Sequence, residues 1–315
     1  MRSFTTSHAQ RDKVPLLIGI TGPSSSGKTY SALRLGSGIA RFNNGPLYVI
    51  DTEHKRALHY ADAFEFEHLD LTPPFGPLDY LSAIEHCMRG KPGCIVVDSM
   101  THEHSGTGGV LDQSECYLRD RLGDDAEKPG PRGKHLATSL IKPKRERKAL
   151  NNAIVQMGVT AIFCYRAQDK IKPIPGKEPE KLGWQAETTS PLTYEMTVRF
   201  LLMPSSDGKP TLMPPNEAER LATKTPAQFR DWFTPGFQLT EELGEKLAAW
   251  AAGGVSPEEA LAARITAATT PAELEALVPD LREARVGKPA RDRLRAAYAA
   301  RQASMAQRQP GEDDK

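Results

Sequence analysis

The chain has 315 residues, and its 41 Lys and Arg nearly balance its 40 Asp and Glu, which leaves a formal net charge of +1. This balance excludes nucleic-acid binding through overall charge, so any such binding needs a local basic patch. The N-terminus lacks the apolar stretch of a signal peptide, no segment approaches membrane-spanning length, and the four cysteines form no C-x-x-C pair. These features predict a soluble, cytoplasmic protein with one large domain and a smaller appendage.

The first predicted element is a strand at residues 14–20, and a glycine-rich loop of the form G-x-x-x-x-G-K-[ST] follows it directly. In such a loop, backbone N–H groups and the N-terminus of the next helix bind phosphate, the lysine adds a positive charge, and the last hydroxyl can bind magnesium. A Gly/Ser turn that matches by accident is the alternative, but a strand before the loop and a helix after it argue against chance. The predicted nucleotide-binding residues are Gly22, Pro23, Ser24, Ser25, Ser26, Gly27, Lys28, Thr29 and Tyr30.

Short apolar runs recur between stretches of helix length, at residues 14–20, 47–50, 94–97 and 159–165. Such runs are typical of buried strands, and they predict an α/β fold with a mainly parallel twisted sheet that helices cover on both faces. Two further runs, at residues 196–203 and 211–213, predict a hairpin that closes one edge of the sheet. In the helix after the glycine-rich loop, we interpret Gly36 and Gly38 as positions of close packing against the sheet.

Two carboxylates follow predicted strands, at the edge where a metal ion and a water molecule would meet the phosphates. Asp98 ends the run at residues 94–97, and the carboxyl end of that strand would place it opposite Thr29 as a second magnesium ligand. Glu53 follows the run at residues 47–50, where it could accept a proton from the water that attacks the terminal phosphate. The alternatives are a turn residue for Asp98 and an acid at a helix start for Glu53.

Two longer segments are rich in residues that favour loops or solvent. Residues 106–144 carry many glycines, prolines and charges, which predicts a mobile surface excursion. Residues 170–190 carry several lysines and Trp184. A solvated loop is the alternative for this second segment, but its position after a predicted core strand, near the edge where α/β sheets bind ligands, favours a functional role.

The composition changes after residues 253–254, where alanine, glutamate, leucine and arginine become dominant. Two helix starts combine a hydroxyl cap, a proline in the first turn and a glutamate three residues after the cap, in Ser256-Pro257-Glu258-Glu259 and Thr270-Pro271-Ala272-Glu273. A third helix is expected at about residues 289–306. These elements predict a small helical bundle, followed by a polar, disordered tail at residues 309–315.

The glycine-rich loop, a strand that ends in Ile50-Asp51-Thr52-Glu53-His54 and a strand that ends in Val97-Asp98-Ser99 together resemble the ATPase core of RecA-type recombinases. The resemblance implies a RecA-like P-loop fold that binds ATP and Mg²⁺, with Lys28 on the phosphates and Glu53 as the catalytic base. It also implies that Tyr60 stacks on adenine and that Arg166 senses the terminal phosphate. An ion-pair partner at the strand end is the alternative for Arg166.

Further motifs resemble phage-encoded ATPases associated with single-strand annealing and recombination: Asp98-Ser99-Met100-Thr101-His102-Glu103, Gly108-Gly109, Tyr165-Arg166-Ala167-Gln168-Asp169-Lys170 and Tyr194-Glu195-Met196. This resemblance implies single-stranded DNA as a partner, a homo-oligomer in the form of a ring or filament, and other phage recombination or replication proteins. The expected organisation is a flexible arm at 1–13, a RecA-like ATPase core at 14–252, a helical domain at 253–308 and a disordered tail at 309–315.

Three basic clusters are candidates for contact with DNA phosphates. They comprise Lys134, Lys142, Lys144, Arg145, Arg147 and Lys148; Lys170, Lys172, Lys177 and Lys181; and Arg282, Arg285, Lys288, Arg291, Arg293, Arg295 and Arg301. Acidic neighbours leave a solvated face as the alternative for the first two, and docking on a partner is the alternative for the third. For the whole chain, the alternatives are a small-molecule or nucleotide kinase and a nucleotide-gated, non-hydrolysing adaptor in phage assembly.

Overall fold

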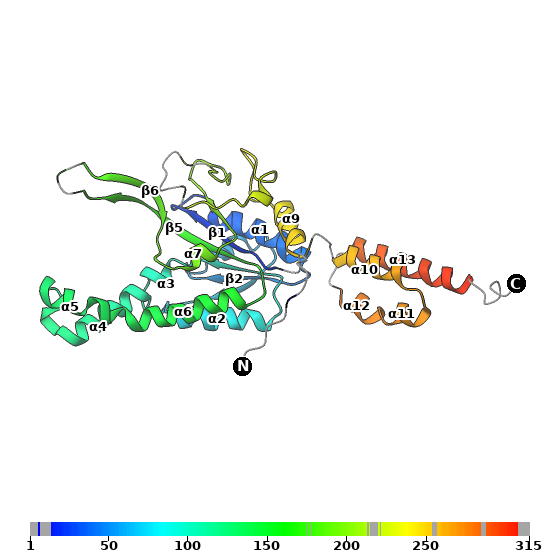
Figure 1. The fold of residues 1–315 in the computed structure, drawn as a ribbon, viewed down its shortest axis with the longest axis horizontal. Coiled ribbons are helices and arrows are strands. Elements are labelled where there is room, and N and C mark those ends of the chain that lie inside the picture. The colour runs from blue at the N-terminus through cyan, green and yellow to red at the C-terminus, as the bar shows by residue number, and fades with distance from the viewer. Residues whose placement is uncertain are drawn as a thin grey trace.

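The computed structural model describes residues 6, 14–174, 176, 178–212, 214, 220, 222–253, 257–284 and 288–307. An α/β core comes first, and a small group of helices follows it (Figure 1). The strands are β1 (Leu17–Gly22), β2 (Leu47–Asp51), β3 (Glu67–Asp70), β4 (Cys94–Asp98), β5 (Ala161–Lys172), β6 (Glu180–Ala186) and β7 (Val198–Leu201). The core helices are α1 (Lys28–Phe42), η1 (Arg56–Tyr60), α2 (Pro77–Arg89), α3 (His102–Ser105), α4 (Val110–Leu122), η2 (Gly123–Asp125), α5 (Pro129–Ser139), α6 (Ile141–Gln156), α7 (Leu192–Glu195), η3 (Ala227–Phe229) and α9 (Glu241–Ala251).

The sheet has seven strands in the order β3-β2-β4-β5-β1-β7, with β6 paired to β5 outside this path. Every pair along the path is parallel, and β6 runs antiparallel to β5. The predicted α/β fold with a mainly parallel sheet is therefore confirmed. Because parallel strands end at the same edge, Gly22, Asp51, Asp98 and Arg166 come together there, with Gly22 paired to Arg166 and Asp51 paired to Asp98.

Helices cover both faces of this sheet. On one face, Ile18 and Ile20 of β1 belong to a core that includes α1 and α9. On the other face, Ile95 and Val97 of β4 pack in a second core with α2 and α6. All residues of β1 and β4 are buried, which is why these strands are apolar runs rather than alternating ones. The two cores fix the strand ends that carry the polar residues of the site.

The two glycines of α1 allow close packing, but in different directions. A Cβ atom on Gly36 would lie 3.0 Å from a side-chain carbon of Leu47 and 3.2 Å from one of Val96, so Gly36 faces the sheet as predicted. A Cβ atom on Gly38 would instead overlap the backbone oxygen of Glu241 in α9. The interpretation of Gly38 as a sheet-facing residue is therefore wrong, since it brings α1 and α9 into backbone contact.

Residues 106–144, which were expected to be a mobile surface excursion, are mostly helical rather than irregular, so the loop character is wrong and the mobility stays a prediction. This segment contains α4, η2, α5 and the start of α6. Its prolines do not prevent this, since α5 begins with a proline, and the first turn of a helix tolerates proline well. A hydrogen bond of 2.5 Å between the hydroxyls of Ser114 and Ser139 and an ion pair between Arg132 and Glu115 hold α5 against α4.

The alternative of a solvated loop at residues 170–190 is wrong, because most of this segment is a β-hairpin, while its functional role stays a prediction. Strand β5 continues beyond the sheet to Lys172, and β6 returns beside it with Trp184 opposite Asp169. Figure 1 shows this hairpin as a projection from the core, on the same side as α4 and α5. Because β5 and β6 pair with each other, the backbone groups of this segment form hydrogen bonds that a solvated loop would lack.

The predicted hairpin at residues 196–203 and 211–213 is reproduced only in part. Strand β7 lies at the edge of the sheet, where it pairs in parallel with β1. Among the described residues, the second run contributes a single antiparallel bridge between Leu201 and Thr211. Met213 lies outside the described residues.

The C-terminal helices are α10 (Pro257–Ala267), α11 (Pro271–Glu275), α12 (Val278–Glu283) and α13 (Lys288–Gln307). Thr270 caps α11 as predicted, since its hydroxyl accepts from Glu273 N at 3.2 Å and the Glu273 carboxylate accepts from Thr270 N at 3.3 Å. Leu261, Ile265 and Leu294 belong to a separate small core. The predicted cap Ser256, nearly all of the arm at 1–13 and the tail at 309–315 lie outside the described residues. Within the part of the chain that is described, no helix has the length and apolar character needed to span a bilayer.

Candidate nucleotide-binding site

The glycine-rich loop joins β1 to α1 in a conformation that depends on its glycines. Gly27 has a φ of 79°, in the left-handed region that glycine adopts most readily. A side chain on Gly22 would collide with the backbone oxygen of Leu202 and with Ser26 Oγ. The first-turn amides of α1 have no side-chain cap, and the buried Ser26 hydroxyl has no hydrogen-bond partner among the described residues. Open donors of this kind at a helix N-terminus fit an anion such as phosphate.

Lys28 is the first residue of α1, and its side chain folds back over the loop. Its Nζ donates a hydrogen bond of 2.8 Å to the backbone oxygen of Pro23. Burial lowers the pKa of Lys28, while the neighbouring Cys164, Asp98 and Glu53 act in the opposite direction. Because a partly desolvated ammonium group interacts more strongly with an anion than one in water, Lys28 is suited to bind phosphate.

The two predicted magnesium ligands meet at the carboxyl edge of the sheet. Thr29 Oγ1 donates a hydrogen bond of 2.5 Å to Asp98 Oδ2. Burial raises the pKa of Asp98 to about 6, although the hydrogen bond from Thr29 acts in the opposite direction. Oxygen ligands of this kind fit Mg²⁺. The described residues contain no group of three or more His, Cys, Asp or Glu side chains that could hold a metal ion. Magnesium sites in nucleotide-binding proteins commonly use one or two protein ligands together with phosphate and water.

Glu53 lies just after β2, and two arginines bind its carboxylate. Arg166 Nε and Nη2 donate to Glu53 Oε1 at 3.0 and 2.7 Å, and Arg56 Nη1 donates to Oε2 at 2.5 Å. Burial alone would raise the pKa of Glu53, but the hydrogen bond and charge of Arg166 and the charge of Arg56 outweigh burial, so the pKa is lowered. The carboxylate is therefore in the ionised form that a general base requires, with both oxygens already bound.

Arg166 connects the end of β1, the segment after β4 and the projecting hairpin. Its backbone is paired with Gly22 at the end of β1, and its N–H donates to Thr101 Oγ1 at 2.9 Å. The same strand continues into the projecting hairpin. The structure thus places Arg166 beside the phosphate loop, as a sensor requires, and also gives it the ion pair with Glu53 that was the alternative.

Thr52 is a positioning residue that the sequence analysis missed. Its N–H donates to Asp98 O at 2.9 Å, and its hydroxyl donates to Ser99 O at 3.1 Å. The hydroxyl also lies 2.8 Å from His102 Nδ1. Thr52 therefore ties the end of β2 to the end of β4, which holds the two predicted carboxylates in a fixed relation. A hydroxyl residue directly before Glu53 was the available signal.

Asp51 was missed as well, and it shapes the turn that carries Glu53. Its buried carboxylate accepts from Glu53 N at 2.7 Å and from Ala57 N at 2.9 Å. Aspartate commonly binds backbone amides a few residues further on, so its position at the strand end was an available signal. Asp51 therefore shapes the turn in which Glu53 lies between Arg56 and Arg166, which bind its two carboxylate oxygens.

Tyr60, the predicted adenine-stacking residue, packs against Tyr30. The two ring centroids are 5.7 Å apart, and the ring of Phe64 lies 5.3 Å from that of Tyr30. Tyr60 is partly buried against the core, whereas Tyr30 is 45% exposed. The stacking role of Tyr60 stays a prediction, and Tyr30 is the more accessible ring of the pair.

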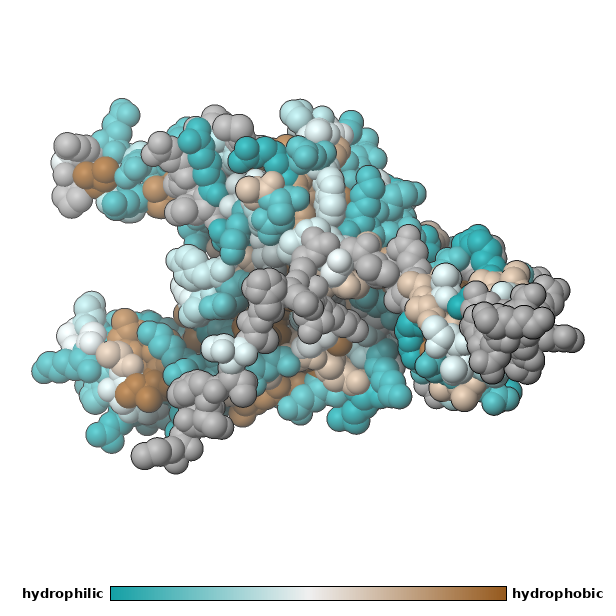
Figure 2. Space-filling model, turned by 45° about the vertical axis from the view of Figure 1, so that its right-hand side comes forward, coloured by the Kyte–Doolittle hydropathy of each residue, from teal (hydrophilic) through white to brown (hydrophobic). Residues whose placement is uncertain are grey.

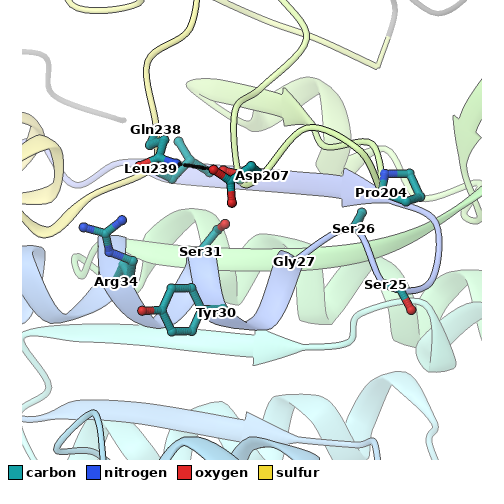
Figure 3. Close-up of a pocket in the computed structure, with 11 residues that line it drawn as sticks. Ser25, Ser26, Gly27, Tyr30, Ser31, Arg34, Pro204, Asp207, Gln238 and Leu239 are labelled. Carbon is teal, nitrogen blue, oxygen red and sulfur yellow. Dashed lines mark hydrogen bonds between the residues drawn. The ribbon is translucent and has the colours of Figure 1, made fainter.

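A cavity of about 210 Å³ adjoins the glycine-rich loop. Figure 3 shows Tyr30, Ser31 and Arg34 along α1 on one side of it and Asp207, Gln238 and Leu239 on the other. The loop residues Ser25, Ser26 and Gly27 also line it. The sequence analysis missed its far wall, because the residues of that wall follow β7 and show no motif.

The basic clusters differ in how much of their charge is accessible. Arg147, of the first cluster, is buried and paired with Glu103 at 2.7 Å, so it is not available to DNA, while Lys144 and Lys148 are exposed on α6. In the second basic cluster, Lys172 and Lys181 are exposed on the hairpin, and Lys177 lies outside the described residues. Figure 2 shows the hairpin and the lobe of α4 and α5 as two projections, mainly hydrophilic with a hydrophobic patch on the lower one.

The third basic cluster is used in part within the C-terminal helices. Arg293 Nε lies 2.7 Å from Glu258 Oε1, which joins α13 to α10. Arg301 donates two hydrogen bonds, of 3.0 and 2.7 Å, to the backbone oxygen of Ala268. These contacts stabilise the bundle, while Arg285 lies outside the described residues.

Comparison with known proteins identifies a structural neighbour but no family. No protein-family model matches the chain, and no curated protein matches it. Among solved structures, a KaiC-like protein, PH0186, from the hyperthermophilic archaeon Pyrococcus horikoshii OT3 is similar over 63% of this chain and 82% of its own, with 14% sequence identity and a TM-score of 0.32. At this level of similarity, the function has to be argued from the residues of the site.

Proposed function

We propose that the chain is a RecA-like, magnesium-dependent ATPase whose hydrolysis is coupled to single-stranded DNA. The observation that carries this proposal is the contact of 2.5 Å between Thr29 and Asp98, directly beside the loop that contains Lys28. This contact joins the first turn of α1, directly after the glycine-rich loop, to a buried carboxylate at the end of β4, which a chance glycine-rich turn would not do.

Each residue of the site has a defined task in this proposal. The loop amides and Lys28 bind the β- and γ-phosphates of ATP, and Thr29 and Asp98 hold Mg²⁺, which would neutralise charge on the phosphates. Glu53 orients the attacking water and accepts its proton. Arg166 stabilises the charge that develops on the transferred phosphoryl group, as a positioned cation does in a preorganised site.

Because Arg166 binds Glu53, the two cannot both act in their proposed roles while the ion pair is intact. The guanidinium has to turn from Glu53 toward the terminal phosphate, a movement that its 46% exposed side chain permits. Arg166 shares β5 with the projecting hairpin, so a ligand on the hairpin could favour this movement. This connection supports coupling between hydrolysis and a bound polymer.

Basic and aromatic residues support DNA as that polymer. Exposed Lys172 and Lys181 lie on the hairpin together with Trp184, and exposed Lys144 and Lys148 lie on α6. Lysines bind phosphates and aromatic rings stack on bases of single strands. The proposal extends to a homo-oligomer that acts in phage recombination, annealing or replication, where it would meet other phage proteins.

The test is ATP hydrolysis by the purified protein with and without single-stranded DNA, together with DNA binding at several salt concentrations. We expect DNA to raise the hydrolysis rate and salt to weaken binding. Phosphoryl transfer to added nucleosides, without stimulation by DNA, would indicate a kinase instead. ATP binding without turnover under all conditions would indicate a nucleotide-gated adaptor.

A further inference from the structure

We propose that the cavity beside α1 is the subsite for the adenine base, that Asp207 recognises the amino group of adenine, and that Tyr30 forms the wall against which the base packs. This inference rests on the proposed function, since it requires that the phosphates of ATP lie in the glycine-rich loop. It assigns base recognition to residues that follow β7, a segment in which no motif indicated a site.

The cavity has the position and size of a base subsite. Ser25, Ser26 and Gly27 line it, so it is continuous with the loop that would hold the phosphates. Its volume of about 210 Å³ lies below the roughly 300–1,000 Å³ of pockets that enclose a whole drug-sized ligand. It therefore fits one end of a nucleotide whose other end lies in the loop.

Asp207 is held at the mouth of this cavity by its own backbone and by Gln238. It has a φ of 52°, in a left-handed turn that aspartate tolerates better than most residues. Gln238 Nε2 donates to Asp207 O at 2.8 Å and to Asp207 Oδ2 at 3.4 Å, and the dashed line in Figure 3 marks a contact between these residues. Gln238 therefore positions the turn, and the exposed Asp207 carboxylate keeps lone pairs that can accept a further hydrogen bond at the cavity.

The chemistry of the carboxylate favours a purine with an exocyclic amino group. An ionised carboxylate accepts hydrogen bonds and donates none, so it suits the N6 amino group of adenine, which donates them. A carboxylate is repelled by unprotonated ring nitrogens and carbonyl oxygens, which are themselves acceptors. An unsubstituted purine, which has neither an amino group nor a ring N–H when it is joined to ribose, would therefore lose the contact with Asp207.

The side walls supply apolar contact. The ring of Tyr30 is accessible, and the rings of Tyr60 and Phe64 support it from behind, at centroid distances of 5.7 and 5.3 Å. Leu239 contributes an apolar surface opposite. Tyr30 is thus placed to contact the base directly, and Tyr60 acts through Tyr30 as a positioning residue.

One end of the cavity is fixed by an ion pair. Arg34 donates to Glu241 through Nε at 3.0 Å and through Nη2 at 2.7 Å, which closes this end with a rigid planar group. A rigid wall lowers the cost of ordering the site when a ligand binds.

The experiment compares the affinities for ATP and for purine riboside triphosphate, which lacks the amino group, by displacement of ribose-labelled fluorescent ATP. We expect the wild type to bind ATP about tenfold more tightly than the analogue, as loss of one hydrogen bond to a charged group implies. Asp207→Asn and Asp207→Gly both tolerate the left-handed turn. We expect Asp207→Gly to bring the ratio close to one, and Asp207→Asn to lower it.

Two controls make the result specific. Asp231→Asn changes an exposed acid outside the cavity and should keep the wild-type ratio. Lys28→Ala should weaken both nucleotides equally, because both carry the same phosphates. An unchanged ratio in Asp207→Gly, with ATP still bound, would overturn the base subsite alone. Absence of any nucleotide binding by the wild type would overturn the proposed function together with it.

The two tyrosines are distinguished in the same assay. Tyr30→Phe keeps the ring and should bind ATP normally, whereas Tyr30→Ala should weaken ATP and the analogue by a similar factor. Tyr60→Ala should have a smaller effect than Tyr30→Ala, since Tyr60 acts through Tyr30. A larger loss in Tyr60→Ala would overturn the assignment of Tyr30 as the wall and support direct stacking on Tyr60.

Discussion

Arg166 binds the carboxylate of Glu53 through two nitrogen atoms, at 3.0 and 2.7 Å, across a sequence separation of 113 residues. The pair joins the residue proposed to activate water to the strand that carries the hairpin. Arg56 binds the other carboxylate oxygen. Hydrolysis would therefore depend on how readily these arginines release Glu53.

Replacement of Glu53 by glutamine should abolish hydrolysis while ATP binding persists. Glutamine keeps the size of the side chain but cannot accept the proton of water, and loss of a general base costs about 10²–10⁴-fold in rate. Phosphate release and nucleotide titration measure the two properties separately. Glu65→Gln, at an exposed acid between η1 and β3, is the control. Turnover at the wild-type rate in Glu53→Gln would refute the assignment.

Removal of Arg166 should change both the rate and its pH dependence. Arg166→Ala should lower the rate by about 10²–10³-fold if the guanidinium stabilises the transition state. Because Arg166 lowers the pKa of Glu53, its loss should raise that pKa, so the residual activity should be lost at a higher pH on acidification.

Arg56→Ala is the matched variant, since Arg56 binds the same carboxylate and also lowers its pKa. It should move the acidic limb of the pH profile in the same direction with a smaller loss of rate. Equal losses in both variants would show that Arg166 acts only through its ion pair with Glu53.

Asp98→Asn should remove the contribution of magnesium to nucleotide binding. In the wild type, ATP with Mg²⁺ should raise the melting temperature more than ATP with a chelator, because Mg²⁺ tightens the binding of ATP and tighter binding stabilises the folded state more. A ligand at 100 times its Kd stabilises a protein by about 2.7 kcal/mol. The variant keeps the shape of the side chain but is a poorer ligand for a hard cation. Thermal unfolding in the presence and absence of Mg²⁺ measures the difference, and an unchanged Mg²⁺ effect would contradict the assignment.

Arg147→Met should destabilise the fold because it leaves Glu103 buried without a partner. Arg147 Nε lies 2.7 Å from Glu103 Oε1, and their side chains are 5% and 1% exposed. Loss of one member of such a pair costs about 3–5 kcal/mol. The double variant Glu103→Gln/Arg147→Met should recover part of this loss, which denaturant unfolding measures.

The pH dependence of this variant has a definite sign. Burial raises the pKa of Glu103, while Arg147 acts against it, so removal of Arg147 raises the pKa further. When the pKa of a carboxyl group is higher in the folded state than in the unfolded state, the group does not reduce stability at a pH below the unfolded-state pKa. As the pH rises from there through the folded-state pKa, the folded state loses stability relative to the unfolded state. Arg147→Met should therefore lose more stability relative to the wild type at about pH 8 than at about pH 5. The opposite trend would contradict this account of the pair.

Gly38→Ala should destabilise the core, since the added methyl group would overlap the backbone of α9 at Glu241. Overpacking of this kind costs about 1–3 kcal/mol. Gly133→Ala, in α5, is a control with the opposite expected sign, because nothing lies within 4 Å of the added Cβ and alanine favours helix by about 1 kcal/mol over glycine. Denaturant unfolding of both variants tests the contact between α1 and α9.

Several residues of the site were predictable because local patterns encode them. The glycine-rich loop needs a left-handed glycine and open amides, and both are features of a short stretch of chain. The position of Asp98 and Glu53 at one edge of the sheet was predictable because apolar runs preceded them, and parallel strands end at one edge. The sequence indicated Tyr30 only as a neighbour of the loop. Its proposed role depends on the residues across the cavity, which follow β7 and carry no motif.

The regular structure of residues 106–144 and 170–190 was missed for a different reason. Glycine, proline and charge favour loops on average, but prolines in the first turn of α5 and pairing of Ser114 with Ser139 allow helices to form. The hairpin forms because β5 extends past the sheet and β6 supplies its missing partner. Such pairing depends on the neighbours that the fold provides, which composition does not describe.

The sequence by itself determined the glycine-rich loop, the buried strands and hence a mainly parallel sheet with polar residues at its carboxyl edge, because these follow from local backbone preferences and hydrophobic patterning. Only the tertiary structure decided that Arg166 binds Glu53, that Thr52 ties β2 to β4, and that Asp207 faces Tyr30 across a cavity. These relations join residues far apart in the chain, and their geometry follows from strand order and side-chain packing, which no local pattern contains.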